Sequence, residues 1–184
     1  MTFPVKVAHL RAGGVPQRLA DLYLPHLNAA MLEFGIVSRE RPAMFIAQIA
    51  HESGGLRYTA EIWGPTPQQM KYDDNGPLAR RLGNGAGEGF QWRGHGFLQV
   101  TGYLNHKAAA YQFGKDITEI AAWLQTPEGA CKSAAHWWFE HGCNEISDEG
   151  DFMRLTKRIN GGLNGLADRE SRYAAVKESM KRET

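Results

Sequence analysis

Apolar residues recur at helical spacing in the first part of the chain. Within residues 19–35 they stand at Leu19, Leu22, Leu27, Met31 and Phe34. This spacing keeps apolar side chains on one side of a helix, so the sequence predicts a helix over Leu19–Gly35. Proline has no backbone N–H and clashes with the preceding turn. Pro25 therefore predicts either a break in this helix or the start of a second one.

A second helix is predicted at Ala43–Ser53, and it ends on polar residues. Pro42 stands directly before it, where proline suits the first helical position. The interior of the segment is apolar, as expected of a helix that faces a core. Gly54 and Gly55 predict its end, because glycine readily adopts the left-handed conformation that closes helices.

The remainder of the chain alternates between loop and helix. Residues 57–89 are rich in proline, glycine, aspartate and asparagine, which predicts a long loop with short helices, and such loops usually carry function. Helical patterns return at Pro127–Gly142, Asp151–Ile159 and Asp168–Arg182. The pattern predicts a mainly α protein with few or no strands. We expect one continuous domain over 1–184, with 57–90 as a smaller, loop-rich lobe and without a separate binding domain.

Composition and charge exclude several classes of protein. The chain has 21 Lys and Arg against 20 Asp and Glu, and no basic stripe appears before its last turns, so nucleic acid is not an expected partner. No apolar run is long enough to span a membrane, and the first 15 residues lack the apolar core of a secretory signal. We therefore expect synthesis in a cytoplasm without an export signal.

The two cysteines, Cys131 and Cys143, do not form a disulfide framework. Two buried thiols are the favoured interpretation, and a single bridge is left open. The chain has no CxxC or HExxH spacing, so no metal site is predicted, and no cofactor is expected.

Glu52 stands in the last turn of the predicted helix Ala43–Ser53. The helix C-terminus carries partial negative charge, so a carboxylate there holds its proton more tightly than in open water, which suits a general acid. A plain surface glutamate is the alternative. Glu61 follows across a glycine turn, and a pair of acids on opposite walls of a groove is what glycoside hydrolysis requires. Alone, Glu61 is equally a solvated loop acid, with Asp73 and Asp74 as rivals.

Four blocks carry a family resemblance, and they stand in the family's order. They are HESGGL (51–56), RLGNG (81–85), WRGHGFLQVTGYLNH (92–106) and INGGLNGLADR (159–169). With these blocks the chain resembles family 19 of the glycoside hydrolases, and within that chitinase-like group it looks most like bacteriophage endolysins. The resemblance runs from Ala43 to Arg172. Each block alone is a weak signal, but four in order are specific.

The resemblance implies a lysozyme-like, two-lobed fold with a substrate cleft walled by the end of the Glu52 helix, the Glu61 loop and the segment 99–105. It implies that Glu52 is the general acid and Glu61 the general base, with Thr101 helping to hold the water. It also implies that the sugar groove is lined by Gln99, Asn105 and Asn160, and that Arg169 orients the catalytic carboxylates.

Aromatic side chains offer faces on which sugar rings pack. The candidates for this role are Trp63, Tyr72, Trp92 and Tyr103. His51 and Arg93 are expected to be supporting neighbours, with His51 hydrogen-bonded to the loop. In two places the chain departs from the family's pattern. Many relatives have R-G-R-G where this chain has His95 as the third residue, and N-Y where it has His106 after Asn105. His95 thus replaces a permanent charge with a titratable group.

The function implied is that of a lysozyme-type, inverting endolysin. It would hydrolyse β-1,4 bonds between N-acetylmuramic acid and N-acetylglucosamine in peptidoglycan, as a monomer released from the host cytoplasm onto periplasmic murein. Family membership equally allows a chitinase. A lytic transglycosylase also uses a glutamate at a helix end, but with a single catalytic acid. An inactive murein-binding module is the alternative outside the enzymes.

Overall fold

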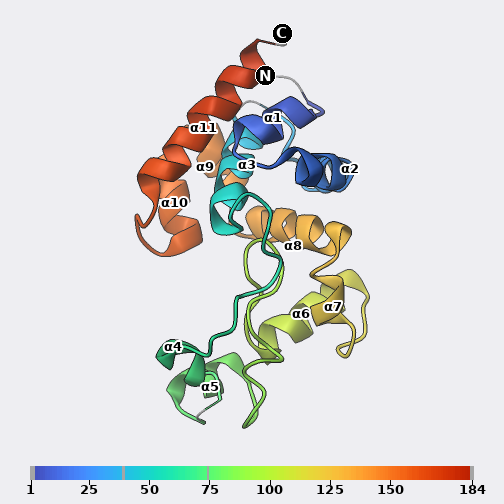
Figure 1. The fold of residues 1–184 in the computed structure, drawn as a ribbon, viewed down its shortest axis with the longest axis vertical. Coiled ribbons are helices and arrows are strands. Elements are labelled where there is room, and N and C mark those ends of the chain that lie inside the picture. The colour runs from blue at the N-terminus through green and yellow to red at the C-terminus, as the bar shows by residue number, and fades with distance from the viewer. Residues whose placement is uncertain (1–2, 39, 74, 183–184) are drawn as a thin grey trace. The chain divides into compact units, whose positions relative to one another are not determined.

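The computed structural model describes residues 3–38, 40–73 and 75–182 and is built mainly from helices (Figure 1). Within these residues, isolated bridges join Ala60 to His95 and His95 to Val100. The prediction of a mainly α protein with few or no strands is confirmed. The chain divides into two compact units, which we call the terminal unit (residues 1–57 and 134–184) and the central unit (residues 58–133).

Six of the described helices lie wholly in the terminal unit. They are α1 (Val7–Ala12), α2 (Gln17–Glu33), α3 (Arg41–Glu52), α9 (Cys143–Asp148), α10 (Phe152–Asn160) and α11 (Leu166–Lys181). Helix α8 (Pro127–Glu140) begins in the central unit and ends in the terminal one. Helix α3 packs against α11 and α9, and α1 packs against α2 and α11 (Figure 1).

Helix α3 is the core of the terminal unit. Every residue from Pro42 to Ala50 is buried, so the helix is covered on all sides, as its nearly uninterrupted apolar sequence demands. The Phe45 ring meets the indole of Trp138 edge-on at 5.2 Å. Gly54 and Gly55 follow the helix with φ values of 61° and 75°. The predicted helix and its glycine stop are therefore confirmed.

The break predicted at Pro25 is wrong. Helix α2 continues through this proline from Gln17 to Glu33. Buried residues lie on both sides of it, among them Ala20, Tyr23, Leu27 and Met31. Burial of this apolar face offsets the backbone hydrogen bond that proline removes from a helix interior, so tertiary packing overrides the local signal.

The central unit has shorter helices and more irregular backbone. Its helices within the described residues are α4 (Pro67–Met70), α5 (Pro77–Leu82), α6 (Tyr103–Phe113) and α7 (Ile120–Trp123). Buried Trp92, Ala110, Ile120 and Leu124 form its apolar cluster. Of the loop-rich stretch expected at 57–90, residues 58–90 fall inside this unit, which extends further, to Ser133.

Both cysteines are buried and free, which confirms the interpretation as thiols. Burial raises the pKa of Cys131 well above its usual value and that of Cys143 to about 12. Across the described part of the chain, no group of three or more His, Cys, Asp or Glu side chains is placed to hold a metal ion. Over the same residues, no helix has the length and apolar character needed to cross a membrane.

Candidate active site

Glu52 is the last residue of α3, and its side chain is 24% exposed. The turn that follows is closed by Ser53, whose hydroxyl donates to the carbonyl oxygen of Ile49 at 2.6 Å and accepts from the backbone N–H of Leu56 at 2.9 Å. Ser53 is fully buried. The HESGGL block thus forms a hydrogen-bonded stop that fixes where the core helix ends, and with it the position of Glu52.

The guanidinium of Arg169 holds the Glu52 carboxylate. Arg169 lies on α11 and its side chain is 2% exposed; its Nη2 donates to Glu52 Oε1 at 2.5 Å. Its Nη1 donates to the Gln48 side-chain oxygen at 2.5 Å, and its Nε donates to the backbone oxygen of Asn164 at 3.3 Å. A buried charge needs such partners to offset its lost hydration. The packing of α11 on α3 therefore brings together two residues that are 117 positions apart in the sequence.

Two polar side chains behind Arg169 were not predicted from the sequence. Gln48 lies one turn before Glu52 and is fully buried. Its Nε2 donates to Thr156 Oγ1 at 3.0 Å, and the Thr156 hydroxyl donates to the carbonyl of Phe152 at 2.9 Å. This chain of hydrogen bonds joins α10 and α3 and continues through Arg169 to Glu52. The available signal was Gln48 itself, a single amide inside an apolar helix, since buried amides require partners.

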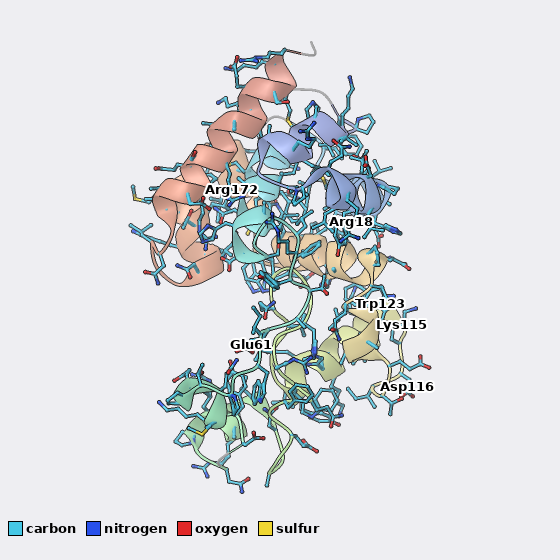
Figure 2. All side chains as sticks on the ribbon, viewed as in Figure 1. Arg18, Glu61, Lys115, Asp116, Trp123 and Arg172 are labelled. Carbon is cyan, nitrogen blue, oxygen red and sulfur yellow. The ribbon has the colours of Figure 1, made fainter. Side chains whose placement is uncertain are left out.

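His51 has a different partner from the one expected. Its Nδ1 lies 2.6 Å from Asp168 Oδ2 in the first turn of α11, whereas a bond to the loop was expected. Arg172, labelled on α11 in Figure 2, donates to the same oxygen at 2.6 Å. The hydrogen bond from Arg172 is the larger cause, and that from His51 the next, of a pKa of Asp168 below its usual value. His51 therefore helps to fasten α3 to α11, next to the contact that Arg169 makes with Glu52.

Asn160 is the last residue of α10 and is half-buried. Its side-chain nitrogen lies 3.4 Å from the carbonyl of Asn164, and Gly161 follows with a φ of 72°. The INGG block thus ends α10 and begins the loop into α11. Asn160 belongs to the same compact unit as Glu52, and its predicted role at the sugar groove stays a prediction.

Glu61 belongs to the central unit, in the irregular segment before α4 (Figure 2). Its backbone N–H donates to the carbonyl of Gly94 at 2.7 Å, and the N–H of Gly94 donates to Glu61 Oε2 at 3.1 Å. The Gln69 side chain donates to the other oxygen, Oε1, at 2.9 Å. Both carboxylate oxygens are therefore hydrogen-bonded, each by a neutral donor.

The rival acids differ from Glu61. Asp73 is half-buried and accepts the backbone N–H of Gly89 at 2.5 Å, and Asp74 lies outside the described residues. Glu61, in contrast, stands beside the glycine turn of the third sequence block, because its backbone pairs with Gly94. Directly after Gly94, His95 pairs with Val100, and the two residues exchange both backbone hydrogen bonds, at 3.0 and 2.8 Å. Glu61 and the segment after Val100 thus flank one turn.

Three polar side chains of the segment 99–105 donate to backbone carbonyl groups in or next to the segment. The side-chain nitrogen of Gln99 donates to the Gly96 carbonyl at 3.1 Å, and that of Asn105 donates to the Thr101 carbonyl at 2.7 Å. The Thr101 hydroxyl donates to the Gln99 carbonyl at 3.0 Å. Since a hydroxyl has one proton and two lone pairs, Thr101 is left to accept a hydrogen bond from a water molecule.

The predicted aromatic residues fall into two groups. Trp63 and Tyr72 are half-exposed, with ring centroids 6.0 Å apart. Burial, and then the charge of Glu61, raise the pKa of Tyr72. Phe90, which was not predicted, meets Trp63 edge-on at 5.8 Å and is 54% exposed. The guanidinium of Arg93 lies 4.0 Å over the Phe90 ring, so Arg93 supports this aromatic group.

Trp92 does not offer a face to a sugar. It is 4% exposed and belongs to the core of the central unit, so its predicted binding role is wrong. Half-buried Tyr103 meets it edge-on at 5.3 Å. Asn84, from the RLGNG block, accepts the Tyr103 backbone N–H at 2.9 Å and donates to the Tyr72 carbonyl at 3.2 Å. That block therefore joins the start of α6 to the loop that carries Tyr72.

Comparison with known proteins decides the family. No protein-family model matches the chain. A relative from Haemophilus influenzae (strain Rd KW20), described as a glycosyl hydrolase family 19 domain-containing protein, is 32% identical, and the match covers 82% of this chain and 85% of the relative. The chain belongs to glycoside hydrolase family 19. It is therefore a glycoside hydrolase, and the family part of the resemblance is confirmed.

Solved structures agree on the family 19 fold. Chitinase C from Streptomyces griseus HUT6037 matches with a TM-score of 0.70 and 20% identity, over 98% of this chain and 94% of that one. A Glu-to-Gln mutant of the same chitinase matches equally well. At this identity the match shows the fold alone, which is the mainly helical, lysozyme-like fold expected. The likeness to bacteriophage endolysins stays a prediction.

This family 19 chain has two carboxylates that are held by hydrogen bonds, and the groups that hold them differ. Glu52 ends a buried helix and is paired with a buried cation, Arg169. Glu61 lies on a loop and is held by neutral amide donors. A carboxyl group serves as a proton donor when protonated and as a base when ionised, and glycoside hydrolysis needs one of each.

Proposed function

We propose that the protein hydrolyses β-1,4 bonds between N-acetylmuramic acid and N-acetylglucosamine in peptidoglycan by an inverting acid/base mechanism. The observation that carries the proposal is the pair of glutamates, Glu52 and Glu61, each fastened by hydrogen bonds in the sequence context that the family resemblance assigns to the acid and to the base. The likeness of the four sequence blocks to endolysins favours murein as the substrate.

In the proposed reaction Glu52 protonates the glycosidic oxygen as the bond to the anomeric carbon breaks. Glu61 takes a proton from a water molecule, which attacks the oxocarbenium-like carbon from the opposite face. Thr101 accepts a hydrogen bond from this water, since its own proton is given to the Gln99 carbonyl. Inversion requires room for the water, so we expect the two carboxyl groups to stand about 6.5–9.5 Å apart.

The remaining residues bind and orient the glycan in this proposal. Arg169 fixes the direction of the Glu52 carboxyl. Amide side chains at Gln99, Asn105 and Asn160 contact sugar hydroxyl and acetamide groups, because amides both donate and accept hydrogen bonds. The exposed aromatic group of Trp63, Tyr72 and Phe90 packs against sugar rings. We further propose that the enzyme is made in a host cytoplasm and acts as a monomer on periplasmic murein.

A chitinase is the second candidate, because the structural neighbours include chitinase C of Streptomyces griseus. The two substrates are separated by a turbidity assay on cells stripped of their outer membrane, run beside release of reducing sugar from colloidal chitin. We expect clearing of the cells and little release from chitin. Activity on chitin alone would overturn the murein assignment and leave the glycosidase assignment intact.

The products separate the remaining mechanisms. Hydrolysis adds one water to each cleaved bond, whereas a lytic transglycosylase leaves a lighter 1,6-anhydro end, so mass spectrometry of digested murein distinguishes the two. An inactive binding module would release no fragments at all. NMR of the first product should show the α-anomer, and a β-anomer would exclude inversion.

A further inference from the structure

We propose that Gln69 is a positioning residue for Glu61, and that the segment Gly64–Gln69 holds the Gln69 amide in the orientation that this role requires. This proposal rests on the proposed function, in which Glu61 is the base. Neither the sequence blocks nor the family resemblance gave a role to Gln69. Of the two groups that donate to the Glu61 carboxylate, Gln69 is the nearer along the chain, at eight residues against 33 for the backbone N–H of Gly94.

The Gln69 amide uses all of its hydrogen-bonding capacity. Its nitrogen donates to Glu61 Oε1 and to the Ile62 carbonyl, both at 2.9 Å. Its oxygen accepts the backbone N–H groups of Gly64 at 3.2 Å and Thr66 at 2.8 Å. The amide group has two donors and one oxygen with two lone pairs, so no capacity remains. Gln69 is also 5% exposed.

This pattern fixes the amide orientation. A flipped amide would point its NH₂ group at the N–H groups of Gly64 and Thr66, and its oxygen at two other oxygens. All four hydrogen bonds would be lost together. The direction of the donor aimed at Glu61 is therefore set by backbone groups on the far side of the amide, and the carboxylate has one favourable orientation against it.

The backbone around Gln69 is built as a capping box. The Thr66 hydroxyl accepts the Gln69 backbone N–H at 3.2 Å, while the Gln69 side chain accepts the Thr66 backbone N–H. Pro67 stands at the start of α4. A capping box accepts glutamate as readily as glutamine at this position. Glutamate, however, has no proton to donate when ionised, so only glutamine serves both the cap and Glu61.

The two oxygens of Glu61 are held from different elements. Gln69 donates to Oε1, and the backbone N–H of Gly94 donates to Oε2 at 3.1 Å. Two separate donors fix the plane of the carboxylate, and each oxygen keeps a lone pair for a water molecule. A base must meet its proton in the right geometry, and small misplacements of reacting groups cost up to about 10²-fold in rate.

The sharpest test is Gln69→Glu, with Gln68→Glu as its control. Both changes place a negative charge on the same short helix, but Gln68 is exposed. Gln69→Glu keeps the cap and replaces a donor to Glu61 with a like charge. We expect kcat on murein to fall about 10- to 100-fold with KM nearly unchanged, and the acid limb of the pH–kcat profile to move to higher pH. Gln68→Glu should keep both within about twofold of the wild type.

A double-mutant cycle with Glu61→Gln separates positioning from general damage. If Gln69 acts through Glu61, then adding Gln69→Glu to Glu61→Gln should cost little further activity. An equal loss in both backgrounds would overturn the proposal, and so would identical behaviour of Gln69→Glu and Gln68→Glu. Circular dichroism checks that each variant folds. If Gln69→Glu does not, Gln69→Met, which removes the donors without adding charge, takes its place in the cycle.

The same assay separates this proposal from the function on which it rests. If Glu61→Gln does not reduce the activity of the wild type, Glu61 is not the base and the proposed mechanism fails. If Glu61→Gln abolishes activity while Gln69→Glu leaves it unchanged, only the positioning role of Gln69 is overturned.

Discussion

The two compact units hold their glutamates by different means. In the terminal unit, Glu52 is held by the charged side chain of Arg169, which is 117 residues away and reaches it through the packing of α11 on α3. In the central unit, Glu61 is held by neutral donors: the amide of Gln69 and the backbone N–H of Gly94. One arrangement depends on tertiary packing, and the other depends mostly on local turns.

This difference bears on how each carboxyl group performs its proposed role. Around Glu52 two influences oppose each other, since the helix C-terminus disfavours a negative charge and the guanidinium favours it. Within the described residues, the hydrogen bonds to the Glu61 carboxylate come from neutral donors, and the charge of Arg93 acts on it only at longer range. The terminal unit should therefore respond to changes that disturb an ion pair, and the central unit to changes that disturb neutral hydrogen bonds.

The largest expected effect is the loss of either glutamate. Glu52→Gln and Glu61→Gln should each lower kcat by about 10²–10⁴-fold, which is the usual contribution of a general acid or base. Glutamine has nearly the same size and keeps one oxygen that accepts from Arg169 or Gln69, and circular dichroism checks that each variant folds. In the pH–rate profile, Glu61→Gln should flatten the acid limb and Glu52→Gln the alkaline limb. The opposite pattern would mean that the two roles are exchanged.

The sequence predicted those features of the fold that depend on local signals. The helix before Gly54 and the glycine stop follow from apolar periodicity and from the conformational freedom of glycine, and the structure has both. The break at Pro25 failed because burial on both sides of the proline outweighs a local preference. Helix α6 was not predicted, because its alanine-rich sequence carries no clear apolar stripe.

The site shows the same limit. The support of Glu52 by Gln48 and Thr156 joins positions 108 residues apart, and no spacing rule links them. Gln69 is different, because the Thr66–Gln69 capping box is visible in the sequence, although its contact with Glu61 is not. Trp92 was misjudged because an aromatic residue in a loop-rich block suits a core as well as a binding face.

The two departures from the family pattern turn out to be neighbours. His95 and His106 were considered separately in the sequence, yet His95 Nδ1 lies 2.8 Å from His106 Nε2, and both side chains are buried. Burial first, then His106 and Arg93, lower the pKa of His95 to about 3, so its ring is uncharged near neutral pH. His95 therefore does not carry the permanent charge of the arginine that many relatives have at this position.

The next largest effect should come from Arg169→Lys. A lysine cannot reproduce the fork that bonds Glu52 and Gln48 together, so one of these partners loses its donor in a buried setting. Lysine keeps the positive charge, so we expect the free energy of unfolding to fall by about 1–3 kcal/mol, the usual cost of leaving a buried hydrogen-bond partner unsatisfied. Urea unfolding followed by circular dichroism measures this.

A matched control for Arg169→Lys exists at the end of the same helix. The Arg182 side chain is 76% exposed and pairs with Glu178 at 3.3 Å. Arg182→Lys should change the free energy of unfolding by no more than about 0.5 kcal/mol, as expected of a surface pair. Equal effects of the two substitutions would show that the contacts of Arg169 with Glu52 and Gln48 contribute no more than a surface pair, and the comparison of how the two glutamates are held would lose its basis.

The smallest effect is a pH dependence that originates in the neutral histidine pair of the central unit. The Nδ1 of His106 lies 2.8 Å from the Gly102 carbonyl, so it donates there and its Nε2 is left to accept the Nδ1–H of His95. Burial lowers the pKa of His106 as well, although the Gly102 carbonyl opposes the shift. Protonation of His106 at Nε2 would place two N–H groups face to face.

The direction of the effect follows from the lowered pKa values. Above the unfolded value of 6.5 both states are neutral and the full stability is present. As the pH falls from about 6.5 toward about 3, the unfolded chain takes up protons that the folded pair resists, so stability is lost with falling pH. The slope is at most about 1.4 kcal/mol per pH unit for each histidine.

His95→Gln removes one of these groups, so the free energy of unfolding should depend less steeply on pH between 4.5 and 6.5 than in the wild type. Partly exposed His136 of the terminal unit also has a lowered pKa, but it is common to both proteins and cancels in the difference. Equal slopes in the two proteins, or an imidazole resonance of His95 that titrates near 6.5 by NMR, would show that the pair is not held neutral, and the contrast with the charged support of Glu52 in the terminal unit would weaken.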